Sequence, residues 1–127
     1  MSIPIRFPIG LLIAFSLCAC GRSEPPATSF SGEVMPILQS RCGECHAPGQ
    51  PGYEASGLSF ADYDSIMAGT RFGPVVVAGD SFGSTLVVLV EGRADPAIAM
   101  PHGDKDRLLA SEVTTLRAWI DQGARNN

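Results

Sequence analysis

The chain has 127 residues, and its 13 acidic side chains outnumber its 9 basic ones, giving a net charge of −4 at pH 7. A mildly acidic chain disfavours nucleic acids and anionic lipid surfaces as partners, because both are themselves negatively charged. Once a predicted N-terminal signal is set aside, about 100 residues remain, which corresponds to one small domain.

The N-terminus has the features of an export signal. Arg6 precedes an apolar run over residues 9–17 that is too short to span a bilayer as a helix. The run ends in Leu17-Cys18-Ala19-Cys20-Gly21, which resembles a bacterial lipobox. The resemblance implies that residues 1–19 are a lipoprotein signal peptide and that Cys20 carries lipid on a bacterial membrane, facing the periplasm. Cys18 fits less well, because Leu17 before it is not small. The alternative is ordinary cleavage, which leaves Cys20 as a plain thiol.

Loss of residues 1–19 removes Arg6, so the mature chain carries −5. Gly21 offers no charge that would retain the lipoprotein at the inner membrane, which favours the outer membrane. Residues 20–29 are polar and include two adjacent prolines, so they predict a flexible lipid-anchored tether. Residues 30–127 are then the folded domain.

The first predicted element of the domain is a helix from about Ser31 to Cys42. Val34, Ile37 and Leu38 recur at helical spacing within it. Pro36 is compatible with this helix if it lies in the opening turn, where its missing N–H is not needed.

The string Cys42-Gly43-Glu44-Cys45-His46 follows this helix, and its spacing is typical of c-type haem attachment. Two intervening residues bring both thiols to one side of a turn, where each can add to one vinyl group of a porphyrin. The histidine comes next and supplies a nitrogen to the iron. The sequence therefore predicts one covalently attached haem c, held by Cys42 and Cys45 with His46 as the proximal ligand.

Two other interpretations of the same string are weaker. A thioredoxin-like dithiol site needs a preceding strand, whereas a short helix is predicted here. A zinc site needs four ligands, yet no cysteine follows Cys45 and the only further histidine is His102. With Cys42 and Cys45 on haem, Cys20 on lipid and Cys18 in the signal, no disulfide is expected.

The middle of the chain alternates loops and short helices. Residues 47–57 hold two prolines and three glycines and are predicted as loop. Asp62 is expected to cap a helix over residues 63–68 that ends at Gly69. Residues 84–92 are rich in β-branched side chains, but Ser84 as a cap and Gly92 as a stop favour a helix over a strand.

The last element is a helix that Ser111 is expected to cap and Gly123 to end. Glu112 suits its first turn, because a carboxylate there faces the positive end of the helix dipole. Its apolar stripe indicates that one face packs in the core, against the first helix. The stripe consists of Val113, Leu116, Trp119 and Ile120.

A haem held by one histidine has a sixth coordination position, and three downstream residues could fill it. Met100 lies in a predicted interhelical loop, and Pro101 favours an extended backbone at Met100, which presents its thioether at low entropic cost. Met67 lies in an apolar helical stretch and is expected in the core. His102 is expected at the surface and remains an alternative ligand. Met100 is the predicted sixth ligand.

These features together resemble the small class I c-type cytochromes, in particular the planctomycete-type cytochrome c domain. The similarity runs in order over nearly all of residues 30–125. Its segments are Val34-Met35-Pro36-Ile37-Leu38, Arg41 to His46, Ser56-Gly57-Leu58-Ser59-Phe60, Gly73-Pro74-Val75-Val76, Gly79-Asp80, Ser84-Thr85-Leu86, Met100-Pro101 and Leu116 to Ala124. It implies an all-α fold of about four short helices around the haem, with the first and last helices crossing. It also implies that Pro74 accepts a hydrogen bond from the proximal histidine through its carbonyl.

The resulting hypothesis is a membrane-tethered electron carrier, not an enzyme, whose haem iron cycles between Fe(II) and Fe(III) with His46 and Met100 as axial ligands. Redox protein partners are expected, with a basic face complementary to this acidic chain. The rivals are a five-coordinate haem enzyme or gas sensor, a bis-histidine cytochrome of lower potential, and a binding module in which haem is structural.

Overall fold

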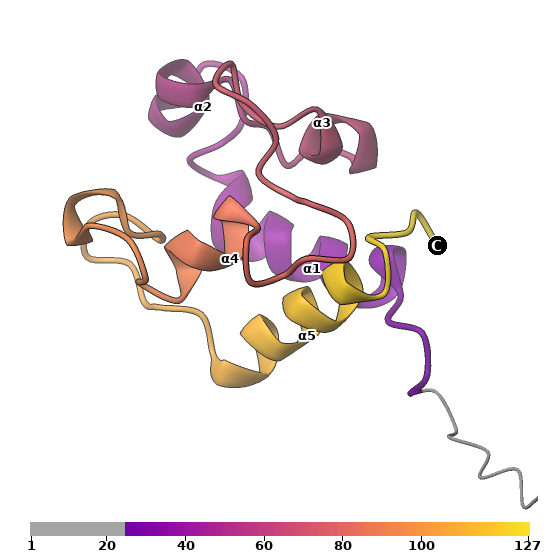
Figure 1. Ribbon diagram of the computed structural model, residues 1–127. Helices are drawn as coiled ribbons and strands as arrows, with labels where there is room; N and C mark the ends of the chain where they lie inside the picture. The colour runs from indigo at the N-terminus through magenta and orange to yellow at the C-terminus, as the bar shows by residue number, and fades with distance from the viewer. Residues whose placement is uncertain (1–24) are drawn as a thin grey trace, which may run out of the picture.

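The computed structural model describes residues 25–127, and these residues form an all-α fold (Figure 1). No β-strand occurs in this range, only an isolated bridge between Thr70 and Gly73. The all-α prediction is confirmed, with five α-helices where about four were expected. The helices are α1 (Met35–Leu38), α2 (Pro51–Ser56), α3 (Tyr63–Ala68), α4 (Thr85–Val90) and α5 (Ala110–Asp121). A 3-10 turn, η3, covers Pro96–Ile98. The predicted signal peptide, Cys20 and the first half of the tether lie outside the described residues.

The first helix is longer than α1, because a π-helical turn flanks α1 on each side. The turns are η1 (Phe30–Val34) and η2 (Gln39–Gly43), so the whole helix covers residues 30–43. Pro36 lies in the middle of this helix, and not in its opening turn, where a proline is ordinarily compatible with a helix. The N–H of Met35 bonds to the carbonyl of Phe30, so the helix changes from wide to regular turns just before Pro36. That change of register accommodates a residue that has no N–H to donate.

Helix α2 corrects the prediction that residues 47–57 form a loop. Pro51 begins the helix, where a fixed φ is favourable and an absent N–H costs nothing. Gly57 ends it in the left-handed conformation at φ 77°, and its N–H bonds to the carbonyl of Tyr53 at 2.6 Å. Proline and glycine here mark the two ends of a helix.

Helices α3 and α4 agree with their predictions. The Asp62 carboxylate accepts from the N–H of Ser65 at 2.8 Å and caps α3, which ends at Gly69. The β-branched segment Thr85–Val90 is helical, as predicted, and it buries Leu86, Val87 and Val90. Ser84 stands at the cap position of α4, but its hydroxyl donates to the carbonyl of Asp80 and accepts from the N–H of Val77.

Helix α5 begins one residue before Ser111, which was expected to cap it. Leu109 is the cap residue, and the Glu112 carboxylate accepts from its N–H at 2.7 Å. A carboxylate that reaches back in this way satisfies a backbone donor at the helix start. Leu116, Trp119 and Ile120 are buried and Val113 is half-buried, as the predicted stripe requires.

The first and last helices pack against each other, as predicted (Figure 1). Val34 and Leu38 are fully buried, whereas Ile37 is half-buried. The Phe30 ring lies 5.4 Å from the Trp119 ring between their centres, at the η1 end of the contact. The aromatic side chains therefore fix how α5 sits on the helix that leads to the Cys-x-x-Cys-His turn.

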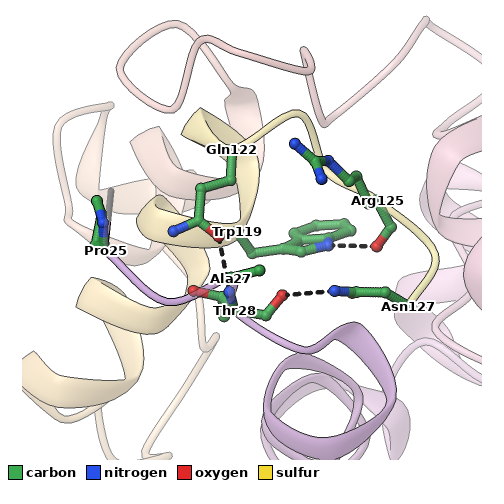
Figure 2. Close-up of a pocket in the computed structure, with 7 residues that line it drawn as sticks. All are labelled: Pro25, Ala27, Thr28, Trp119, Gln122, Arg125 and Asn127. Carbon is green, nitrogen blue, oxygen red and sulfur yellow. Dashed lines mark hydrogen bonds between the residues drawn. The ribbon is translucent and has the colours of Figure 1, made fainter. Parts of the chain in front are cut away.

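Residues just before the first helix are bound to the end of the chain (Figure 2). The N–H of Thr28 donates to the Gln122 side chain at 2.7 Å, and Asn127 accepts from Phe30 at 2.8 Å and donates to the carbonyl of Thr28. Next to these bonds, the Trp119 indole donates to the carbonyl of Arg125 at 2.9 Å. The fold therefore includes Thr28 and Ser29, which shortens the predicted tether of residues 20–29. Between residues 25 and 127, no helix has the length and apolarity to cross a membrane.

Candidate cofactor site

A cavity of about 480 Å³ lies among the helices, lined by residues between Arg41 and Leu108 in the sequence. Its size falls within the range of cofactor sites, roughly 300–1,000 Å³. One wall is formed by the Cys-x-x-Cys-His turn, α2 and residues 58–60, and the opposite wall by α4 and residues 100–108. Most side chains in these walls are apolar, so the cavity suits a large hydrophobic group.

The two predicted attachment cysteines lie together in the cavity wall. The first helix ends there, and the N–H groups of Cys45 and His46 both bond to the carbonyl of Cys42, at 3.2 and 3.1 Å. This compact turn brings all three side chains to the same wall. Both cysteines are half-buried free thiols. Burial, together with the neighbouring Cys45, raises the pKa of Cys42 to about 12, so its thiol stays protonated at neutral pH.

His46 is held in one orientation by a backbone carbonyl. Its Nδ1 lies 3.3 Å from the Leu58 carbonyl oxygen, and since a carbonyl can only accept, Nδ1 carries the proton. That leaves Nε2 as the nitrogen with a free lone pair. The ring is 8% exposed, and its burial lowers the pKa of His46, although the Leu58 carbonyl partly opposes the shift. A neutral, oriented imidazole is the form that binds a metal.

The acceptor for His46 is therefore Leu58, and the prediction of Pro74 in this role is wrong. Pro74 is exposed and lies outside the cavity wall. The adjacent carbonyl, that of Gly73, accepts from Thr70 through its N–H at 2.9 Å and its hydroxyl at 3.0 Å. These bonds close the Gly73-Pro74 segment into a turn of its own, whereas the left-handed Gly57 redirects the chain so that the next carbonyl faces His46.

Helix α2 supports the attachment turn directly, and sequence reasoning missed it. The N–H groups of Gly52 and Tyr53 both bond to the Cys45 carbonyl, at 2.9 and 3.2 Å. A Cβ on Gly52 would lie 2.7 Å from that carbonyl oxygen and 3.0 Å from His46 Nε2. Only glycine lets α2 approach so closely. The Pro51-Gly52 pair at a helix start was the signal that could have revealed this support.

Two of the three candidates for the sixth position lie in the opposite wall. Met100 is half-buried, packs against the core, and its N–H bonds to the Leu89 carbonyl at 3.2 Å. His102 is exposed, and its Nδ1 lies 3.1 Å from the Ala99 carbonyl oxygen. Met67 packs against the core outside this wall, as expected. The structure thus brings both Met100 and His102 to the cavity.

Charged pairs border the cavity on the side of the attachment turn. Arg41 donates to Glu112 at 2.9 Å, which ties the first helix to α5 and lowers the pKa of Glu112. Glu44 and Lys105 lie 2.5 Å apart between Oε2 and Nζ. Their hydrogen bond lowers the pKa of Glu44 and raises the pKa of Lys105, so both remain charged near neutral pH.

An all-helical fold, with a Cys-x-x-Cys-His turn set in the wall of an apolar cavity and a buried, oriented histidine, defines a small cytochrome c domain. Residues 42–104 match the model of the family described as planctomycete cytochrome C. The chain therefore carries a planctomycete-type cytochrome c domain, as the sequence resemblance implied, and haem-based electron transfer is its general function. No curated protein and no solved structure shows a significant match to the chain.

Proposed function

We propose that this protein is a lipid-anchored electron carrier with one haem c, attached through Cys42 and Cys45 and ligated axially by His46 and Met100. The observation that supports it best is the cavity itself, which has the attachment turn in one wall and Met100 in the other. A bound haem would supply the redox chemistry, a one-electron exchange between Fe(II) and Fe(III).

The protein residues hold and insulate the haem in this proposal. The Leu58 carbonyl fixes the His46 ring, so that Nε2 would be held in one direction toward a bound haem. Leu58, Phe60, Leu86 and Leu89 line the cavity and exclude water from it. A thioether from Met100 favours the reduced metal and hence a relatively high potential. The acidic chain suits donors and acceptors that present a basic face.

A second candidate is a cytochrome in which His102 replaces Met100 or acts as an acid–base group beside an open iron. Its support is that His102 lies in the same wall, two residues after Met100. The exposure of His102 and the anchoring of Met100 to Leu89 favour Met100.

Covalent attachment is tested by extraction with acidified acetone after production in a host that attaches haem c. The proposal expects the full chain to keep its haem and to gain the mass of one haem group. Cys42→Ala and Cys45→Ala should each lose one thioether bond, and the double variant should release all haem to the solvent. Complete release from the unchanged protein would contradict the proposal.

The lipid anchor rests on the lipobox-like segment around Cys20. Acyl chains on Cys20 exceed what reversible membrane binding requires, so salt washing should leave the protein on membranes and detergent should release it. The processed Cys20→Ala protein should be released by washing. Retention of that variant at high salt would exclude Cys20 as the anchor.

A further inference from the structure

An ion pair joins the two walls of the haem site at their edge. Glu44 lies between the two attachment cysteines, and Lys105 lies five residues after Met100 and lines the cavity. The lysine amine donates to the glutamate carboxylate at 2.5 Å across a sequence separation of 61 residues. Lys105 is also the only lysine in the sequence. The pair therefore links the turn that carries the haem to the loop that carries the predicted sixth ligand.

The loop over residues 91–109 is called the Met100 loop below. Its outer part, residues 101–107, has few contacts besides this ion pair. Met100 is bound to Leu89 at one end of that part, and Leu108 is buried at the other. Residues 102–107 are exposed, and Pro101 is half-buried. Within residues 25–127, Glu44–Lys105 is the one hydrogen bond or ion pair that connects residues 101–107 to a part of the chain outside the loop.

We propose that Glu44 and Lys105 form a clasp that keeps the Met100 loop closed over the haem, so that access to the sixth coordination position depends on ionic strength. The proposal rests on Met100 as the sixth ligand. When the clasp is open, residues 101–107 lose their link to the attachment turn, and the loop would hold Met100 over a bound haem less firmly.

The exposure of the pair gives the clasp its salt dependence. Glu44 and Lys105 side chains are 80% and 42% exposed, so dissolved ions screen their attraction. The screening length falls from about 10 Å at 0.1 M salt to about 3 Å at 1 M. An exposed pair contributes modestly, so we expect effects of about two- to fivefold, not the complete loss of closure.

The test is the rate at which imidazole binds the ferric haem-loaded protein, because loop opening must come before imidazole reaches the iron. Glu44→Gln and Lys105→Gln should each raise this rate about two- to fivefold at low salt. The unchanged protein should reach the same rate in 1 M salt, where the variants should no longer differ from it. The charge-reversed double variant, Glu44→Lys with Lys105→Glu, should restore the slow rate.

Glu54→Gln is the matched control. Glu54 is an exposed carboxylate on α2, in the cavity wall opposite the loop, and it has no ion pair within the described residues. Its loss changes the net charge as Glu44→Gln does but should leave the imidazole rate unchanged. An equal acceleration in Glu54→Gln, or an effect of Lys105→Gln without one of Glu44→Gln, would overturn the clasp.

Amide hydrogen exchange separates the clasp from the choice of ligand. The amide of Met100, whose N–H bonds to the Leu89 carbonyl, should exchange faster in both single variants and slow again in the charge-reversed variant, whether or not the Met100 thioether is the ligand. If imidazole binds at once to every protein while exchange still follows the ion pair, the Met100 assignment fails and the clasp stands. Exchange that is identical in all variants would overturn the clasp alone.

Discussion

The wall that carries His46 is held by converging backbone hydrogen bonds, whereas the outer part of the wall that carries Met100 depends on a single exposed ion pair. His46 has its Nδ1 on Leu58, its N–H on Cys42, and the start of α2 packed against its ring edge. Beyond Met100, residues 102–107 are exposed. Local opening is governed by such differences in buried contacts and hydrogen bonds. We therefore expect the Met100 side to open first, while the histidine and the attachment turn stay in place.

The largest loss of stability is expected from removing a buried side chain that supports the first helix, which leads to the attachment turn. Leu116 is fully buried on α5, which packs against the first helix. Leu116→Ala should lower the free energy of unfolding by about 2–5 kcal/mol, the usual range for a buried large-to-small change. Denaturant titration of the haem-loaded protein measures this loss.

Leu109 supplies the matched control at the end of the Met100 loop. Its side chain is 60% exposed, so Leu109→Ala should change stability little. An equal loss of unfolding free energy in Leu109→Ala and Leu116→Ala would contradict the expectation that the buried residue on α5 contributes more than the exposed end of the loop.

A smaller effect is expected at the contact between α2 and His46. A Cβ on Gly52 would meet the Cys45 carbonyl and the imidazole edge, so Gly52→Ala should cost about 1–3 kcal/mol by forcing α2 outward. The same denaturant titration measures the cost, and the haem absorption spectrum reports any change at His46.

Gly43→Ala is the control for Gly52→Ala within the attachment turn. Nothing lies within 4 Å of a Cβ at Gly43, and its φ is not positive. This substitution should leave stability and spectrum nearly unchanged. If Gly52→Ala were equally silent, α2 would not hold His46 closely.

The sequence predicted the elements that depend on local signals. Asp62 and Gly69 mark the ends of α3 through capping, and the apolar stripe around Leu116 and Trp119 identified α5. The Cys-x-x-Cys-His turn was also recognisable, because its pattern lies in five consecutive residues. Helix α2 replaces the loop predicted for residues 47–57, because proline and glycine are typical of loops in general but favour a helix at its first position and just past its end.

The remaining features depend on how distant segments meet. Whether Leu58 or Pro74 faces His46 is decided by the path of the chain after Gly57, which no short pattern encodes. Nothing near Glu44 in the sequence indicates that it pairs with Lys105. The bonds of Thr28 to Gln122 and Asn127 likewise join segments that are far apart in the chain.

The identity of the sixth ligand is read from the absorption spectrum of the ferric haem-loaded protein in Met100→Ala and His102→Ala variants. A sulfur–iron(III) bond gives a weak band near the red end of the visible range. We predict that the unchanged protein and His102→Ala show this band, and that Met100→Ala loses it, binds carbon monoxide once reduced, and has a lower reduction potential. Loss of the original ligation in His102→Ala, with Met100→Ala unaffected, would rule out Met100 as the ligand and identify a bis-histidine cytochrome.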